Sequence, residues 1–187
     1  MHLLLLPVLG EFRRKYPKIR LRISSYTAPQ AIQTVRNGLS DFAVASTPAE
    51  VKKPLKAIPL LSFKEILVAN AAYKDMFKEP VSLKKLVKYP FICLGKTTST
   101  YDFYTRFFLE HGIAMTADTE AATIDQILPM VRQNLGIGFI PEPLAQEVIE
   151  QGIVIQVPLL EEPPVREICL VEDRKSTRLN SSHITNS

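Results

Sequence analysis

The stretch TEAATIDQILPMVRQNLGIGFIPEPLAQ, residues 119–146, decides the fold of this chain. Apolar residues recur at helical spacing over residues 124–135, which predicts an amphipathic helix there. A glycine-bracketed apolar run at 136–140 predicts a strand, and Pro141 ends it before a second helix that begins near Glu142. This order of elements favours a small-molecule-binding α/β unit over a catalytic site.

Small and hydroxyl residues in this stretch add detail to the prediction. Gly136 and Gly138 carry no Cβ, so the helix and the strand can approach each other closely. Thr123 precedes the helix and Gln126 follows three residues later, which matches a capping box. The hydroxyl and the free N–H groups at such a helix start are also suited to hold an anion.

Outside this stretch the chain continues to alternate between helices and strands. In its first part the spacing predicts a helix at 5–16, a strand at 19–23, a helix at 29–37 and a strand at 42–45. This order is typical of an α/β layer with parallel strands. Further strands are expected at 55–61, 63–69, 91–94, 116–122, 153–157 and 165–171, with helices at 83–87 and 101–111. If the closing strand returns to the first unit, the two chain crossings form a hinge beside a cleft.

The composition is that of an ordinary globular protein, with 46% hydrophobic and 22% charged residues. The 187 residues are enough for one good core or for two small lobes that share a hinge. The net charge of +4 falls to near neutral without Arg174, Lys175 and Arg178, so the pI of 9.1 is weak support for nucleic-acid binding by this segment. Cys93 and Cys169 lie in apolar runs, which predicts buried free thiols and a reducing compartment.

Signals for export, membrane insertion and common catalytic chemistries are missing from the sequence. The apolar start is broken by Pro7 and has no basic leader, and no segment is long and apolar enough to span a bilayer, so a cytoplasmic location is expected. Three histidines and two separated cysteines give no credible metal-ligand spacing. There is no nucleophile elbow, phosphate-binding glycine loop or dinucleotide fingerprint, so we expect neither an enzyme nor a cofactor.

Three segments in register carry a resemblance to a known family: LLPVLGEFRRKYPKIRLRIS at 5–24, TAPQAIQTVRNGLSDFAVAS at 27–46 and ILPMVRQNLGIGFIPEPLA at 127–145. In order and spacing the pattern extends over residues 3–172, and it resembles the effector-binding domain of LysR-type transcriptional regulators. The resemblance implies an α/β, two-lobed fold similar to that of type 2 periplasmic binding proteins. Residues 1–66 and 164–173 would form the first lobe and residues 67–163 the second.

The resemblance also implies a small effector, expected to be anionic, in the cleft between the lobes. In the family the effector alters the geometry of a homo-oligomer and thereby the way an N-terminal winged helix-turn-helix sits on DNA, and that module is not in this sequence. The opening strand and the terminal helix of the family are also missing, so the fold is expected to be incomplete at both ends. The segment 174–187 shows no apolar periodicity and is expected to be a non-native, unstructured tail.

Candidate effector-binding residues are hydroxyl side chains at the starts of helices and the ends of strands. Thr97, Thr98, Ser99 and Thr100 open the expected helix 101–111, where they would hold an anionic group or would simply cap the helix. Thr123 has the same two interpretations. Thr27 matches the effector loop of the first lobe in the family, and Ser46 follows the strand 42–45.

Two further classes of protein compete with an effector-sensing domain. A free solute-binding protein of a transport system would have the same fold, but the missing export signal argues against it. A small enzyme on this scaffold is disfavoured because the sequence offers few paired acid and base candidates.

Overall fold

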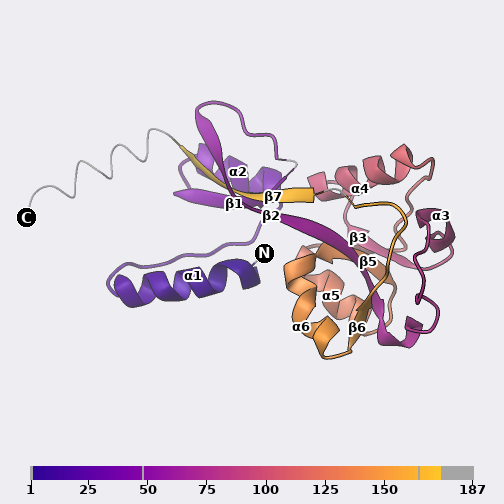
Figure 1. Ribbon diagram of the computed structural model, residues 1–187. Coiled ribbons are helices and arrows are strands. Elements are labelled where there is room, and N and C mark those ends of the chain that lie inside the picture. The colour runs from indigo at the N-terminus through magenta and orange to yellow at the C-terminus, as the bar shows by residue number, and fades with distance from the viewer. Residues whose placement is uncertain (1, 48, 164, 174–187) are drawn as a thin grey trace, which may run out of the picture.

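The computed structural model describes residues 2–47, 49–163 and 165–173. Its helices are α1 (His2–Lys15), α2 (Ala28–Arg36), α3 (Leu83–Leu86), α4 (Ser99–Glu110), α5 (Ile124–Arg132) and α6 (Glu142–Glu150), with a 3₁₀ turn at Ala71–Tyr73. Its strands are β1 (Phe42–Ser46), β2 (Leu55–Asn70), β3 (Phe91–Leu94), β4 (Thr119–Ala121), β5 (Ile137–Pro141), β6 (Val154–Gln156) and β7 (Val165–Asp173). Figure 1 shows them in two lobes joined by the long strand β2.

Strand β2 belongs to both lobes because its two halves pair with different strands. Residues 55–64 pair antiparallel with β7, which also pairs antiparallel with β1, and α2 packs on this group. Residues 65–70 pair antiparallel with β5 and β6. Beyond β5 the sheet continues to β3 and then β4, both in parallel pairings. The lobes therefore share one continuous strand at their junction.

The alternation of side chains along β2 fills the second lobe on both faces of its sheet. Leu67 and Ala69 point into an aromatic core, in which Tyr104 stacks on Phe139 with ring centroids 4.9 Å apart. Ile66 and Val68 point into an aliphatic core on the opposite face, packed under α5 and α6. The first lobe has a smaller core, formed by Ile32, Val35, Ala43, Leu55 and Val171.

The close approach predicted at Gly138 is confirmed. A Cβ atom there would lie 2.8 Å from Cγ2 of Ile127 on α5, so only glycine lets the helix and the strand pack at this distance. At Gly136 the close neighbour is different. A Cβ atom would lie 2.5 Å from the carbonyl oxygen of Pro90, just before β3, so this glycine serves the contact between strands rather than the contact with α5.

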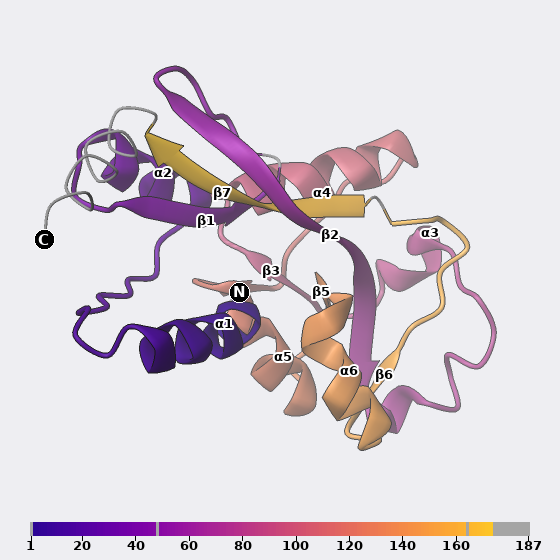
Figure 2. The ribbon, with the colours of Figure 1, turned by 60° about the vertical axis from the view of Figure 1, so that its left-hand side comes forward.

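The strand predicted at 19–23 is wrong. This segment has no regular secondary structure and belongs to no sheet, and its residues are exposed. Alternation of apolar residues makes a strand only where a neighbouring backbone supplies a ladder, and among the described residues β1 pairs with β7 alone. Figure 2 shows α1 and the segment that follows it running beside the sheet of the first lobe without joining it.

Three other predictions about strands need correction or refinement. The first lobe is antiparallel rather than parallel, because β7 lies between β1 and β2. The two strands expected at 55–61 and 63–69 are one strand, with a register shift between Pro59 and Leu61 in place of a turn. The strand expected at 116–122 is only the short β4. The closing strand does return to the first lobe as β7, and the tail 174–187 lies outside the described residues.

Candidate functional site

A cavity of about 850 Å³ lies at the junction of the two lobes, and it brings together most of the predicted site residues. Thr27, Ser46, Thr98, Ser99, Thr100 and Thr123 all line it. Thr97 is exposed and is not part of the lining. Hydroxyl groups that are up to 96 residues apart in sequence, from Thr27 to Thr123, therefore face one space.

Three helices begin at this cavity. Thr27, Thr98 and Thr123 are the N-cap residues of α2, α4 and α5, all with extended backbone at the cap. The first turn of a helix has N–H groups without intrahelical partners and carries the positive end of the helix dipole. Convergence of three such helix starts favours an occupant with negative charge or hydrogen-bond acceptors.

Several hydroxyls in the lining are already engaged in capping. Oγ1 of Thr98 accepts a hydrogen bond from the N–H of Tyr101 at 3.1 Å and donates to the carbonyl of Gly95 at 2.8 Å. Oγ1 of Thr27 donates to Oε1 of Gln30 at 3.0 Å. The capping interpretation of Thr98 is therefore correct, and its hydroxyl proton is directed at the protein rather than at the cavity.

Arg166 on β7 is the residue of this site that the sequence analysis missed. Its guanidinium forms an ion pair with Glu65, with Nη1 2.7 Å from Oε1, and Nε donates to the carbonyl of Thr47. Nη2 donates to Oγ of Ser46 at 2.9 Å and to Oγ1 of Thr100 at 3.1 Å. Arg166 is 2% exposed and Glu65 is 1% exposed, so one buried charge pair links β1, β2, β7 and α4.

Aromatic rings and burial set the electrostatics of this pair. The guanidinium carbon lies 4.8 Å from the ring centroid of Phe103 and 5.9 Å from that of Phe63. Burial raises the pKa of Glu65 above its ordinary value, while the guanidinium of Arg166 opposes that shift. Burial, followed by the negative charge of Glu65, raises the pKa of Tyr104 well above its ordinary value.

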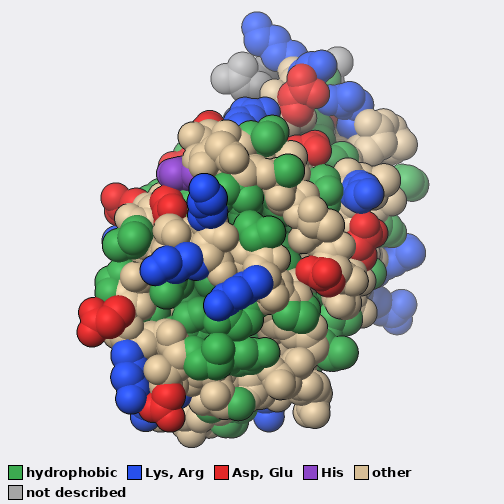
Figure 3. Space-filling view, turned by 90° about the vertical axis from the view of Figure 1, so that its right-hand side faces the viewer, with side chains coloured by type: hydrophobic (Ala, Val, Ile, Leu, Met, Phe, Trp, Pro, Cys, Tyr) green, Lys and Arg blue, Asp and Glu red, His purple; other side chains and the backbone are tan. Residues whose placement is uncertain are grey.

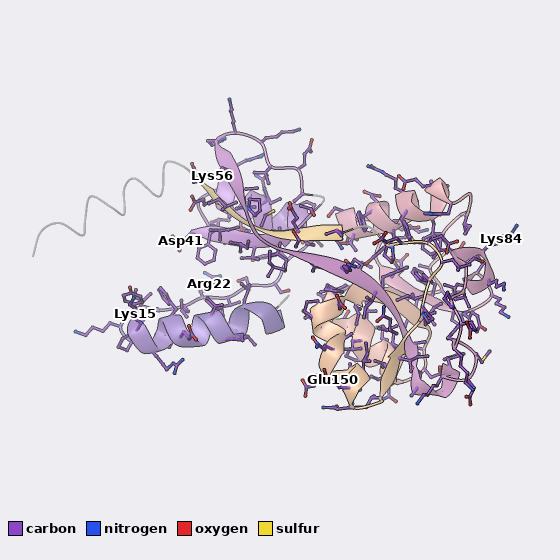
Figure 4. All side chains as sticks on the ribbon, in the orientation of Figure 1. Lys15, Arg22, Asp41, Lys56, Lys84 and Glu150 are labelled. Carbon is purple, nitrogen blue, oxygen red and sulfur yellow. The ribbon has the colours of Figure 1, made fainter. Side chains whose placement is uncertain are left out.

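Other charges around the cavity are of both signs. Arg20 and Arg22 line it from the irregular segment after α1, and Asp41 and Asp125 line it from the starts of β1 and α5. Figure 4 shows Arg22 on that segment and Asp41 at the sheet of the first lobe. On the face of the second lobe seen in Figure 3, the described Lys and Arg side chains are interspersed with acidic and apolar ones.

The part of the chain that the structure describes contains no candidate metal site. No group of three or more His, Cys, Asp or Glu side chains there is placed to hold a metal ion. Cys93 and Cys169 are buried free thiols, as predicted, and burial raises the pKa of Cys93 to about 12. The cavity can offer hydrogen-bond donors and a buried cation to an occupant.

The sequence model of the LysR substrate binding domain matches residues 1–181. The chain belongs to this family. Among curated relatives, it is 25% identical over 134 residues to the HTH-type transcriptional regulator CysB of Burkholderia cenocepacia. The matched region makes up 72% of this chain and 43% of CysB. It is 23% identical over 147 residues to the transcriptional regulator Cbl of Escherichia coli, and the matched region makes up 79% of this chain and 46% of Cbl. The chain thus spans about half the length of the curated relatives it matches.

Solved structures confirm the two-lobed fold of this LysR substrate-binding domain. The cofactor-binding domain of the Cbl transcriptional regulator superposes with a TM-score of 0.75 at 23% identity, over 91% of this chain and 74% of that one. The regulatory domain of Synechocystis CcmR in complex with 2-PG superposes with a TM-score of 0.77 at 17% identity, over 97% of this chain and 90% of the CcmR chain. These relatives are transcription regulators, so the alternative of a transport solute-binding protein gains no support. No described helix of the domain is long and apolar enough to cross a membrane.

The sequence contained a signal for the ion pair between Arg166 and Glu65, which the sequence analysis missed. In VREICLV, the alternation of the strand places Arg166 in phase with Ile168, and in FKEILVA it places Glu65 in phase with Phe63 and Leu67. A charged residue in the inward phase of an apolar strand requires a buried partner. Two such residues of opposite sign therefore predict an ion pair, although not which neighbours share it.

Proposed function

We propose that this domain senses a small anionic metabolite, bound in the cavity at the junction of the lobes, for a LysR-type transcription regulator. The observation that carries the proposal is the convergence of three helix starts and the Arg166 guanidinium on one cavity. Each of these groups favours negative charge or acceptor atoms in the occupant. Thr27, Ser46, Thr98, Ser99, Thr100 and Thr123 are the proposed effector-binding residues, and Thr97 has no place in the cavity.

We assign residues 1–66 and 164–173 to one lobe and residues 67–163 to the other. The change of partner along β2, from β7 at Lys64 to β5 at Glu65, supports a boundary close to the one assigned. Binding of the effector would bias the angle between the lobes, because Ser46 and Thr100 contact the same guanidinium from opposite sides of the junction. The proposed response is a shift in domain geometry without chemical conversion of the effector.

We further propose that the complete regulator acts in the cytoplasm as a homo-oligomer and binds DNA through an N-terminal winged helix-turn-helix outside this chain. Support comes from the relatives, which are named as HTH-type regulators and are about twice as long as the matched region. Leu6 and Val8 on α1 are 50% and 63% exposed, which supports a contact between protomers through this helix.

Calorimetry with a panel of anionic metabolites and their neutral amides tests the proposal. The expected result is saturable binding of at least one anion, weakened about tenfold or more by Ser46→Ala or Thr123→Val, since one hydrogen bond to a charged group contributes about 1.5–3 kcal/mol. Ser62→Ala and Thr116→Val make the same two substitutions at exposed positions outside the cavity and serve as controls. Binding that these cavity variants leave unchanged, or turnover of a bound compound, would contradict the proposal.

A further inference from the structure

The hydroxyls that line the cavity are not equivalent, because their protons point in different directions. A guanidinium only donates hydrogen bonds, so a hydroxyl that accepts from it must direct its own hydrogen elsewhere. Ser46 and Thr100 both accept from Nη2 of Arg166. By contrast, Thr98 and Thr27 give their protons to Gly95 and Gln30 within the protein.

Neither Ser46 nor Thr100 donates its hydroxyl proton to any acceptor in the described part of the chain. Both residues line the cavity, and Thr100 is only 7% exposed, so its O–H group is almost excluded from bulk water. An O–H donor in such a place needs an acceptor from an occupant or from water in the cavity. These two donors come from different lobes, Ser46 at the end of β1 and Thr100 in the first turn of α4.

The charge pair behind these hydroxyls is oriented as well. Arg166 lies in the cavity lining, whereas Glu65 is absent from it and lines a second, smaller hollow beside Val157 and Pro158. The cavity therefore faces the positive end of the ion pair, although the pair as a whole is neutral. An occupant with bare oxygen atoms satisfies both the donors and this potential, while an occupant that presents N–H or O–H groups at the same place does not.

We propose that Arg166 is a positioning residue that presents the hydroxyls of Ser46 and Thr100 as paired donors, one from each lobe, and so selects an unprotonated oxyanion group that bridges the lobes. The group is a sulfate, a phosphate or a carboxylate, whose oxygens share the acceptor chemistry that the donors require. This inference rests on the proposed function, because it concerns the same cavity. In addition, the inference states that Arg166 acts by positioning the two hydroxyls and does not itself donate hydrogen bonds to the effector.

Inorganic sulfate and sulfamide are suitable probes, because sulfamide is a neutral analogue that carries amino groups in place of two sulfate oxygens. We expect the 187-residue chain to bind sulfate at least about tenfold more tightly than sulfamide in calorimetry, because hydrogen bonds from the hydroxyls to sulfate are charge-assisted and those to the uncharged oxygens of sulfamide are not. Phosphate and acetate, measured in the same way, distinguish among the three oxyanion groups. Equal affinity for sulfate and sulfamide, or no saturable oxyanion binding, would overturn the inference.

A double-mutant cycle separates positioning from general support of the fold. Arg166→Lys keeps a cation for Glu65 but lacks the second nitrogen, Nη2, that reaches both hydroxyls, and Thr100→Val removes one of these hydroxyls. Each is expected to lower sulfate affinity about tenfold or more, and the double variant is expected to lose less than the product of the two losses, because Arg166→Lys already disturbs the Thr100 hydroxyl that Thr100→Val removes. Additive losses, or wild-type selectivity in Arg166→Lys, would refute the positioning role.

Two further measurements keep this test decisive. Ser46→Ala leaves Arg166 and Glu65 in place, so it tests the other donor even if Arg166→Lys unfolds the chain, and Ser62→Ala is its matched control. If anions bind and Thr123→Val weakens them but Ser46→Ala does not, the sensing function stands and the oxyanion inference falls. If anions bind and Ser46→Ala weakens them as expected, both stand.

Discussion

The packing of α5 on β5 gives a sharp quantitative prediction through Gly138→Ala. The added Cβ would lie 2.8 Å from Cγ2 of Ile127 and 3.1 Å from the carbonyl oxygen of Ile92, so the helix or the neighbouring strand must shift. Overpacking of a buried site costs about 1–3 kcal/mol, and the lower chain entropy of unfolded alanine offsets about 0.4–1 kcal/mol of that loss. We expect a net loss of about 1–2 kcal/mol, or a Tm lower by about 2–8 °C for a chain of this size.

Urea unfolding followed by circular dichroism measures this loss, and Gly10→Ala is the matched control. No atom lies within 4 Å of a Cβ added at Gly10 in α1, so the same change there should be neutral or stabilising by up to about 1 kcal/mol. Ile127→Ala, which removes Cγ2, should cost less in the Gly138→Ala background than alone, because the new methyl group fills part of the space. Strictly additive costs, or a Gly138→Ala variant within about 0.5 kcal/mol of the wild type, would refute this account of the contact.

Three further predictions concern the site and the buried titratable groups. Thr98→Val should lower the free energy of unfolding by about 1 kcal/mol through loss of the α4 cap, whereas the exposed Thr97→Val should change it by less than about 0.5 kcal/mol; equal effects in chemical unfolding would contradict the cap. Glu65→Leu alone should cost about 3–5 kcal/mol by leaving a buried cation, and adding Arg166→Met should recover much of that loss; a double variant no more stable than the single one would exclude this explanation. Burial raises the pKa of the Cys93 thiol in the folded state to about 12, from an ordinary value near 9. The protonated thiol therefore contributes its full stabilisation below about pH 9. This stabilisation is lost as the pH rises toward 12, at up to about 1.4 kcal/mol per pH unit. Unfolding titrations between pH 8 and 10 should therefore show a shallower decline in Cys93→Ala than in the wild type, and parallel curves would argue against it.

The second lobe was the more predictable part of the fold, because its elements are set by local sequence. The capped start of α5, the close approach at Gly138 of β5 and the apolar run of β3 each depend on neighbouring residues, and all three were found as expected. The strand predicted at 19–23 failed because strand formation needs a partner backbone, which a single segment cannot specify. The order of strands in the first lobe was missed for a similar reason, since β7 inserts between β1 and β2 from the far end of the chain.

The candidate site divides in the same way. Hydroxyl residues at helix starts are visible as a local pattern, and all but Thr97 were found in the lining of the cavity. Which of them have a proton free for an occupant depends on contacts that are distant in sequence. Thr100 meets Arg166 across 66 positions and Ser46 meets it across 120. No spacing rule connects residues so far apart, so the distinction between capping hydroxyls and donor hydroxyls required the fold.

The Arg166 and Glu65 pair lies where β2 passes from one lobe to the other. Arg166 lies opposite Phe63 in the β2–β7 ladder, and Glu65 is the first residue of β2 that pairs with β5 instead. A buried ion pair contributes little net stability compared with well-packed apolar residues, so its main consequence here is geometric. It fixes a guanidinium where the lobes separate, with one hydroxyl from each lobe bonded to the same nitrogen. A ligand held by both hydroxyls, as proposed, would therefore add a second bridge between the lobes, and its affinity would depend on the angle between them.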